Sequence, residues 1–118
     1  MDERLEKALE FSRYRISLFN RKEDLKVRLR TMLLHATDGG IFSINPQLIT
    51  FVEMLVSKGR TQAVLLDDNG NPIEITDLAR FADDIISKYF ESTNLYYAEY
   101  AKLRSARTVK SIYEFVND

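Results

Sequence analysis

All four glycines and both prolines of this 118-residue chain lie between Gly39 and Pro72. Because these two residue types are the strongest breakers of helices, the segments on either side can form long helices. Apolar residues in both outer segments recur at spacings of three and four, which is the period of an amphipathic helix. The sequence therefore predicts two long helices that flank a compact middle.

The N-terminal segment, from Asp2 to about Thr37, carries two apolar series. The first series is Leu5, Leu9, Ser12, Ile16 and Phe19, and the second is Leu18, Leu25, Leu29, Met32 and Leu33. Gly39-Gly40 is a good helix stop, since glycine accepts the left-handed conformation of a C-terminal cap. A helix of about 35 residues would be about 50 Å long, so a break near Asn20 is an alternative.

The middle segment predicts a strand at residues 41–44, then a short helix and a β-hairpin. Asn45-Pro46 is typical of a helix start, and Gly59 is typical of its end. The buried stripe of that helix is expected to be Leu48, Ile49, Val52, Leu55 and Val56. The following run, QAVLLD-DNGN-PIEI, is a hairpin pattern, with Pro72 at a strand start or edge.

The C-terminal segment predicts the second long helix, from Thr76 as its N-cap to about Val116, with Asp77 in its first turn. Its apolar series is Leu78, Ala82, Ile85, Tyr89, Thr93, Tyr96, Tyr100 and Leu103, extended by Ile112, Tyr113 and Val116. The expected fold is α+β and mostly α. Two long antiparallel helices flank a short helix and a small antiparallel β-hairpin or sheet, in a single helix-rich domain over residues 1–118.

Composition narrows the function classes. The chain has no cysteine and one histidine, His35, so thiolate chemistry, cysteine-based zinc sites and a histidine-paired metal site are excluded. The N-terminus MDERLEKALEF lacks the apolar core of a signal peptide, and no apolar run approaches a membrane span. We expect a cytosolic or virion protein that is not an enzyme, with no cofactor, metal, membrane or small-molecule substrate.

Basic residues concentrate in the first helix, at Arg13, Arg15, Arg21, Lys22, Lys26, Arg28 and Arg30. Phe11, Tyr14 and Phe19 are interleaved with them, and such a helix can track phosphates. Arg21, Lys22, Arg28 and Arg30 are therefore candidate contacts to nucleic acid or a partner. Because the basic positions spread around a helix, the alternative is solvated charge beside a buried seam.

The charge is unevenly distributed. Residues 1–37 carry a net charge of +3, residues 38–99 carry −6, and residues 100–118 carry +2, which sum to the −1 of the whole chain. This layout suits head-to-tail self-association or a charged partner. Ordinary solvated helix faces explain it equally well.

Other polar patterns have structural explanations. Asp67, Asn69 and Asn71 match the first ligand spacings of a calcium loop, but Pro72 stands where that loop needs glycine, and a turn explains them fully. Asp83 and Asp84 are adjacent, so on a helix their side chains point about 100° apart and do not converge on one ion. Asp77 and Asp84 are two helical turns apart. Neither pair therefore has the geometry of a two-carboxylate site. His35 is expected near a helix end, where the helix dipole favours a histidine, so its presence there does not require a catalytic role.

Aromatic residues concentrate on the last helix, at Tyr89, Phe90, Tyr96, Tyr97, Tyr100 and Tyr113. Tyr89, Tyr96 and Tyr100 fall on the expected seam and are interpreted as core. Tyr97 lies off that seam, so an exposed Tyr97 would be a candidate anchor for a partner.

The segments ALEFSRYRISLFNRKEDLK, VLLDDNGNPIEI and KYFESTNLYYAEYAKLRSAR resemble small proteins of T4-like tailed phages, including cyanophages. This resemblance implies a structural, scaffold or adaptor protein of phage assembly, in the host cytoplasm or the virion, and implies no catalytic residues. Polar interruptions of the seams, such as Ser12 and Thr93, favour pairing with another copy. We therefore expect a homo-oligomer or a protein partner; the alternative is a nucleic-acid-binding accessory protein that uses the basic first helix.

Overall fold

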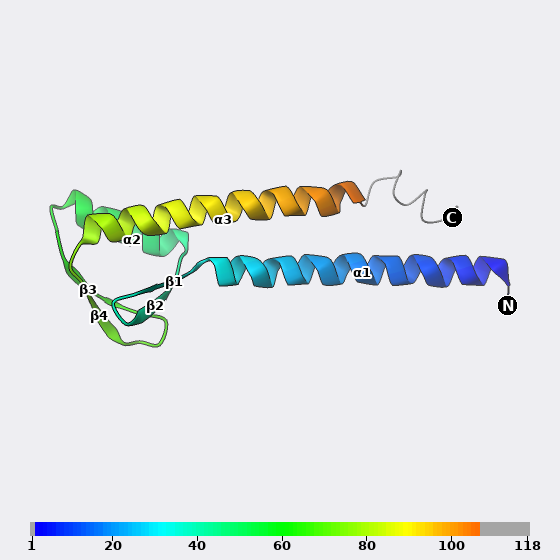
Figure 1. Cartoon of the computed structure of the whole chain (residues 1–118), viewed down its shortest axis with the longest axis horizontal. Helices are drawn as coiled ribbons and strands as arrows, with labels where there is room; N and C mark the ends of the chain where they lie inside the picture. The colour runs from blue at the N-terminus through cyan, green and yellow to red at the C-terminus, as the bar shows by residue number, and fades with distance from the viewer. Residues whose placement is uncertain (1, 107–118) are drawn as a thin grey trace. The chain divides into compact units, whose positions relative to one another are not determined.

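The structure is a computed structural model that describes residues 2–106 (Figure 1). The elements in order are α1 (Glu3–Met32), β1 (Leu34–Thr37), β2 (Gly40–Ser43), α2 (Pro46–Ser57), β3 (Ala63–Leu66), β4 (Pro72–Ile75) and α3 (Leu78–Ala106). The strands form two antiparallel two-stranded sheets, β1–β2 and β3–β4. The expected fold class is confirmed, since the fold is α+β, mostly α, with two long helices flanking a short one.

The chain divides into two compact units, described here separately. The first contains residue 2, residues 3–28 of α1 and residues 95–106 of α3, and these two helical segments run in opposite directions (Figure 1). The second contains residues 29–94. The predicted apolar extension at Ile112, Tyr113 and Val116 lies outside the described residues, and the single domain over residues 1–118 stays a prediction.

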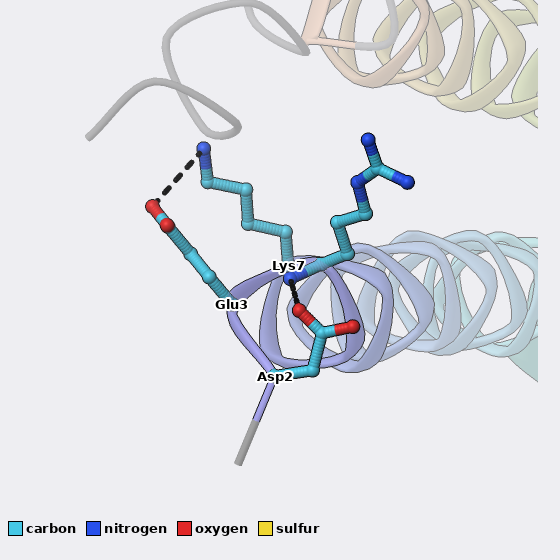
Figure 2. A network of polar contacts seen from close by, with 4 residues as sticks. Asp2, Glu3 and Lys7 are labelled. Atoms are coloured by element: carbon cyan, nitrogen blue, oxygen red, sulfur yellow. Dashed lines mark hydrogen bonds and ion pairs between the residues drawn. The ribbon is translucent and has the colours of Figure 1, made fainter.

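Helix α1 begins with a local polar network (Figure 2). The Asp2 carboxylate accepts a hydrogen bond of 3.1 Å from the Arg4 backbone N–H, which satisfies a donor that the first helical turn leaves unpaired. Lys7 Nζ lies 3.8 Å from the Glu3 carboxylate one turn earlier. From there the helix continues without the alternative break near Asn20.

The first helix ends at Met32, so the predicted extension to Thr37 is wrong. Leu34–Thr37 is a strand instead, paired with β2 in the register His35 to Phe42. Asp38 and Gly39 join the strands with φ values of 51° and 83°, which is the backbone of a two-residue hairpin turn. Gly39, which the sequence predicts as a helix cap, serves this turn instead. His35 lies on a strand rather than at a helix end.

Both ends of α2 are capped as predicted. The Asn45 side chain accepts a hydrogen bond of 2.8 Å from the Leu48 N–H at the start. At the other end Gly59 has a φ of +82°, and the Arg60 N–H donates to the Leu55 carbonyl at 3.0 Å. This left-handed glycine cap satisfies carbonyls that the last helical turn leaves free.

The predicted hairpin is confirmed as β3–β4, and Asp67 organises its turn. Its carboxylate accepts backbone N–H bonds from Asn71 at 2.8 Å, from Asn69 at 3.0 Å and, across to β2, from Ile41 at 3.3 Å. The bond from Asn71 does most to lower the pKa of Asp67 below its usual value; the N–H groups of Ile41 and Asn69 act in the same direction, and burial opposes them. Asp67, Asn69 and Asn71, whose spacing matches the start of a calcium loop, thus form the hairpin turn instead.

Asp68 attaches this turn to the other sheet. Its backbone N–H donates to the Ile41 carbonyl at 2.8 Å, and its carboxylate accepts from the Ser43 N–H at 2.9 Å and the Ser43 hydroxyl at 2.6 Å. Two consecutive aspartates therefore join the two sheets through β2.

Replacing Asp67 with asparagine should flatten the acid side of the stability profile. Because the folded pKa of Asp67 is lower than the unfolded one, its contribution is present at neutral pH and is lost as pH falls through the unfolded and then the folded pKa, from about pH 5 downwards. The test is the midpoint of thermal unfolding, followed by circular dichroism, measured for wild type and variant from pH 7 down to acidic pH. Asp83→Asn, at an exposed α3 position, is the matched control. Equal slopes in the two variants would contradict the assignment.

Helix α3 begins one residue later than predicted. The Asp77 carboxylate accepts the Arg80 N–H at 3.1 Å, and the Asp77 carbonyl accepts the Phe81 N–H at 3.0 Å. Asp77 is therefore the N-cap, and the expectation of Thr76 in that place is wrong. The physical reason is that β4 continues to Ile75, so Thr76 is needed to leave the strand before the helix can start.

The core of the second unit forms where α2, α3 and the sheets meet. The Phe42 and Phe81 rings pack edge to face at 5.3 Å, linking β2 to α3. The buried apolar residues are Phe42, Ile44, Val52, Leu65, Ile73, Ile75, Leu78, Phe81, Ala82 and Ile85. The predicted α2 stripe faces this core, although only Val52 in it is fully buried.

Candidate functional site

The structure does not gather the four predicted basic contacts into one patch. Arg21 and Arg28 are seven residues apart, which places them on one face of α1, and both are exposed. Lys22 is half-buried, with its Nζ 5.3 Å from the centroid of the Tyr100 ring, a cation–π contact. Arg30 belongs to the second unit. Lys22 therefore has a structural role in the first unit, and of the four residues only Arg21 and Arg28 remain together on one face.

Acidic side chains accompany that pair. A hollow of about 370 Å³ in the first unit is lined by Arg21, Asp24, Leu25, Arg28, Glu99, Lys102 and Leu103. Within it the Lys102 ammonium lies 3.1 Å from the Glu99 carboxylate. Three bases facing two acids leave a small net positive charge, which is a weak attraction for a nucleic-acid backbone.

The three α3 tyrosines that the sequence places on the seam, Tyr89, Tyr96 and Tyr100, are half-buried rather than fully buried. Tyr96 and Tyr100 are half-buried, with their rings stacked at 6.1 Å, and Tyr89 packs against the core of the second unit. Tyr97 is 74% exposed, which keeps it as a candidate anchor. Tyr113 lies outside the described residues.

His35 lines a polar hollow of about 240 Å³ in the second unit, together with Thr37, Asp38, Ile75, Thr76, Asp77, Arg80, Phe81 and Asp84. Burial, and after it Lys88, lowers the pKa of His35, while Asp84 opposes them. The ring packs against Phe81 at 5.7 Å. Among residues 2–106, His35 has no hydrogen-bond partner that would activate it as a base, so a packing role explains it best.

The first apolar series of α1 is exposed on the surface of the first unit. We call Leu5, Leu9, Ser12, Ile16 and Phe19 the apolar stripe. Its four apolar members are exposed: Leu5 50%, Leu9 41%, Ile16 59% and Phe19 61%. Leu18 and Leu25, from the second series, are the buried residues of the helix. The helix thus uses one series within the chain and presents the other on its surface.

The apolar stripe is also hollowed. Ser12, Arg15, Ile16 and Phe19 surround a shallow depression of about 370 Å³ in the first unit. These residues follow one another at i, i+3, i+4 and i+7, so they border the depression on one helix face. Sequence reasoning identified the series but missed that it would stay uncovered while the second series became the buried one.

No helix in the described part of the chain is both long and apolar enough to cross a membrane. Among the same residues, no group of three or more histidine, cysteine or acidic side chains could hold a metal ion. Comparison with protein-family models, with curated proteins and with solved structures finds no match to this chain.

Proposed function

We propose that this chain is a non-enzymatic interaction protein that assembles with further copies of itself through the apolar stripe of α1. The observation that supports this most is the exposure of Leu5, Leu9, Ile16 and Phe19 along one helix face. Large apolar side chains exposed along one helix face are costly in water and are typical of interaction sites. Burying it against an identical surface removes it from water in both copies at once.

The resemblance to small proteins of T4-like tailed phages favours the same role. A structural, scaffold or adaptor protein in the host cytoplasm or the virion needs a binding surface rather than a catalytic site. Nucleic-acid binding through Arg21, Lys22, Arg28 and Arg30 stays an alternative prediction, less well supported because these residues are divided between the two units.

Light scattering coupled to size exclusion tests the proposal. The full chain should elute as a dimer or larger species, at least twice the 13.7 kDa of one copy, at both low and moderate salt. Ile16→Gln should shift the mass to that of a monomer, because it places a polar amide on the apolar stripe. Phe90→Gln is the matched control, since Phe90 is an exposed aromatic on α3 (60%) outside the stripe.

A wild-type chain that is monomeric at all concentrations tested would overturn the proposal. An oligomer that Ile16→Gln and Phe90→Gln leave equally intact would also overturn it, because assembly would then use another surface. A Tyr97→Gln variant identifies whether that surface includes the exposed tyrosine.

A further inference from the structure

We infer that the partner on the apolar stripe is a second copy of α1 lying antiparallel, with Leu5 of each copy opposite Ile16 of the other and Glu6 of each copy beside Arg13 of the other. This inference rests on the proposed function and specifies its geometry. It follows from three observations: the spacing of the stripe, the depression on its surface, and the charges along its edge.

The spacing is that of a coiled-coil seam. Members of the apolar stripe succeed one another at alternating intervals of four and three residues, from Leu5 to Phe19. A strict repeat of 3.5 residues keeps a seam facing one partner helix, whereas a helix that packs on a globular core usually has a broader apolar face. The stripe is therefore suited to pairing with another helix.

The depression can accept one side chain of a partner helix. Ser12, Arg15, Ile16 and Phe19 have the relative positions of the four residues that form a hole in knobs-into-holes packing. In an antiparallel pair with Leu5 opposite Ile16 of the second copy, the Leu5 side chain is the knob that enters it. Leu9 then lies opposite Ser12, and two-fold symmetry repeats both layers.

Charges on one edge of the stripe select this register. Glu6 and Arg13 are seven residues apart, so they lie on the same edge of α1. Neither side chain has an ion-pair partner among residues 2–106. In the antiparallel pair the two-fold axis sets like edges against each other, so Glu6 of each copy lies near Arg13 of the other. Two opposite-charge contacts form.

Other alignments lose these contacts. Sliding the antiparallel pair by one heptad brings Glu6 against Glu6 in one direction and Arg13 against Arg13 in the other. A parallel pair in register sets Glu23 against Glu23 and Lys26 against Lys26, because both continue the seam beyond Phe19. Like charges facing each other oppose association, so the alternatives are selected against.

Disulfide cross-linking determines the orientation of the two helices. Because the wild-type chain has no cysteine, only the introduced cysteines can form disulfides. Leu5→Cys and Ile16→Cys variants are oxidised separately and as an equal mixture. The antiparallel pair predicts a disulfide-linked dimer in the mixture only. In this register position 5 of one copy lies eleven residues, about 16 Å along the axis, from position 5 of the other, and the same separation holds for position 16, which is too far for a disulfide. Cross-linking of Leu5→Cys with itself would overturn the antiparallel arrangement.

Charge exchange tests the register. Glu6→Arg and Arg13→Glu should each weaken the dimer about ten-fold, because two attractive contacts become repulsive. An equal mixture of the two variants should associate as well as wild type, since every contact is then between opposite charges. Dimer dissociation constants by analytical ultracentrifugation measure this.

The outcomes separate the two proposals. A dimer that Ile16→Gln disrupts, but in which the mixed variants regain nothing, keeps the apolar stripe as the interface and overturns the antiparallel register. A dimer unaffected by Ile16→Gln overturns both. A wild-type monomer, whether another protein or residues 107–118 occupy the stripe, also overturns both.

Discussion

Replacing Ile85 with alanine is expected to destabilise the second unit by about 2–5 kcal/mol. Ile85 has no exposed surface and lies on α3 in the centre of the core, beside Leu78 and Ala82. Truncation removes three carbon atoms and leaves a cavity that helix and sheets cannot close without moving together. Urea unfolding followed by far-ultraviolet circular dichroism measures the loss as a lower midpoint at an unchanged slope.

Two variants calibrate this result. Ile85→Val, which removes one methylene group, should cost about 0.5–1.5 kcal/mol. Ile86→Ala, at the next and only half-buried position, should cost less than Ile85→Ala. If the two alanine variants unfold at the same midpoint, α3 does not direct Ile85 into the core as described.

Replacing Gly40 with alanine should destabilise the second unit by about 1–3 kcal/mol through overpacking. A Cβ atom at this position would lie 2.6 Å from Cγ1 and 2.9 Å from Cδ1 of Ile73, which is closer than non-bonded carbon atoms approach each other. Gly40 therefore permits β2 to lie against β4. Its role is spatial rather than conformational, since its φ is not in the left-handed region.

A double-mutant cycle with Ile73→Ala isolates that contact. Gly40→Ala should cost much less when Ile73 is already alanine, because the atoms it would strike are gone. Gly39→Ala is the matched control: its Cβ would meet nothing within 4 Å, but its φ of +83° is strained for alanine by about 1–2 kcal/mol. The cost of Gly39→Ala should not depend on Ile73. Additivity of Gly40→Ala with Ile73→Ala would contradict the steric explanation.

Local signals were sufficient for much of the fold. Asn45 and Gly59 cap α2 because a side-chain oxygen before a helix and a glycine after it satisfy the backbone in almost any context. The β3–β4 hairpin follows from two β-prone runs separated by a turn that Asp67 organises through its own neighbours. These interactions span a few residues, so the sequence predicts them without tertiary information.

Competing local signals were resolved only in the folded structure. Glycine at positive φ suits a helix cap and a hairpin turn equally, and Asp38-Gly39 became a turn because it lets Phe42 reach the core against Phe81. Likewise, Asp77 rather than Thr76 caps α3 because β4 continues to Ile75.

The candidate site divides in the same way. The sequence by itself determined that α1 is a helix with two apolar series, since both follow from periodicity alone. Only the tertiary structure decided that Leu18 and Leu25 are buried and that the apolar stripe is exposed. The physical reason is that burial depends on which surface another segment covers, and periodicity is the same for a face that packs inward and a face that awaits a partner.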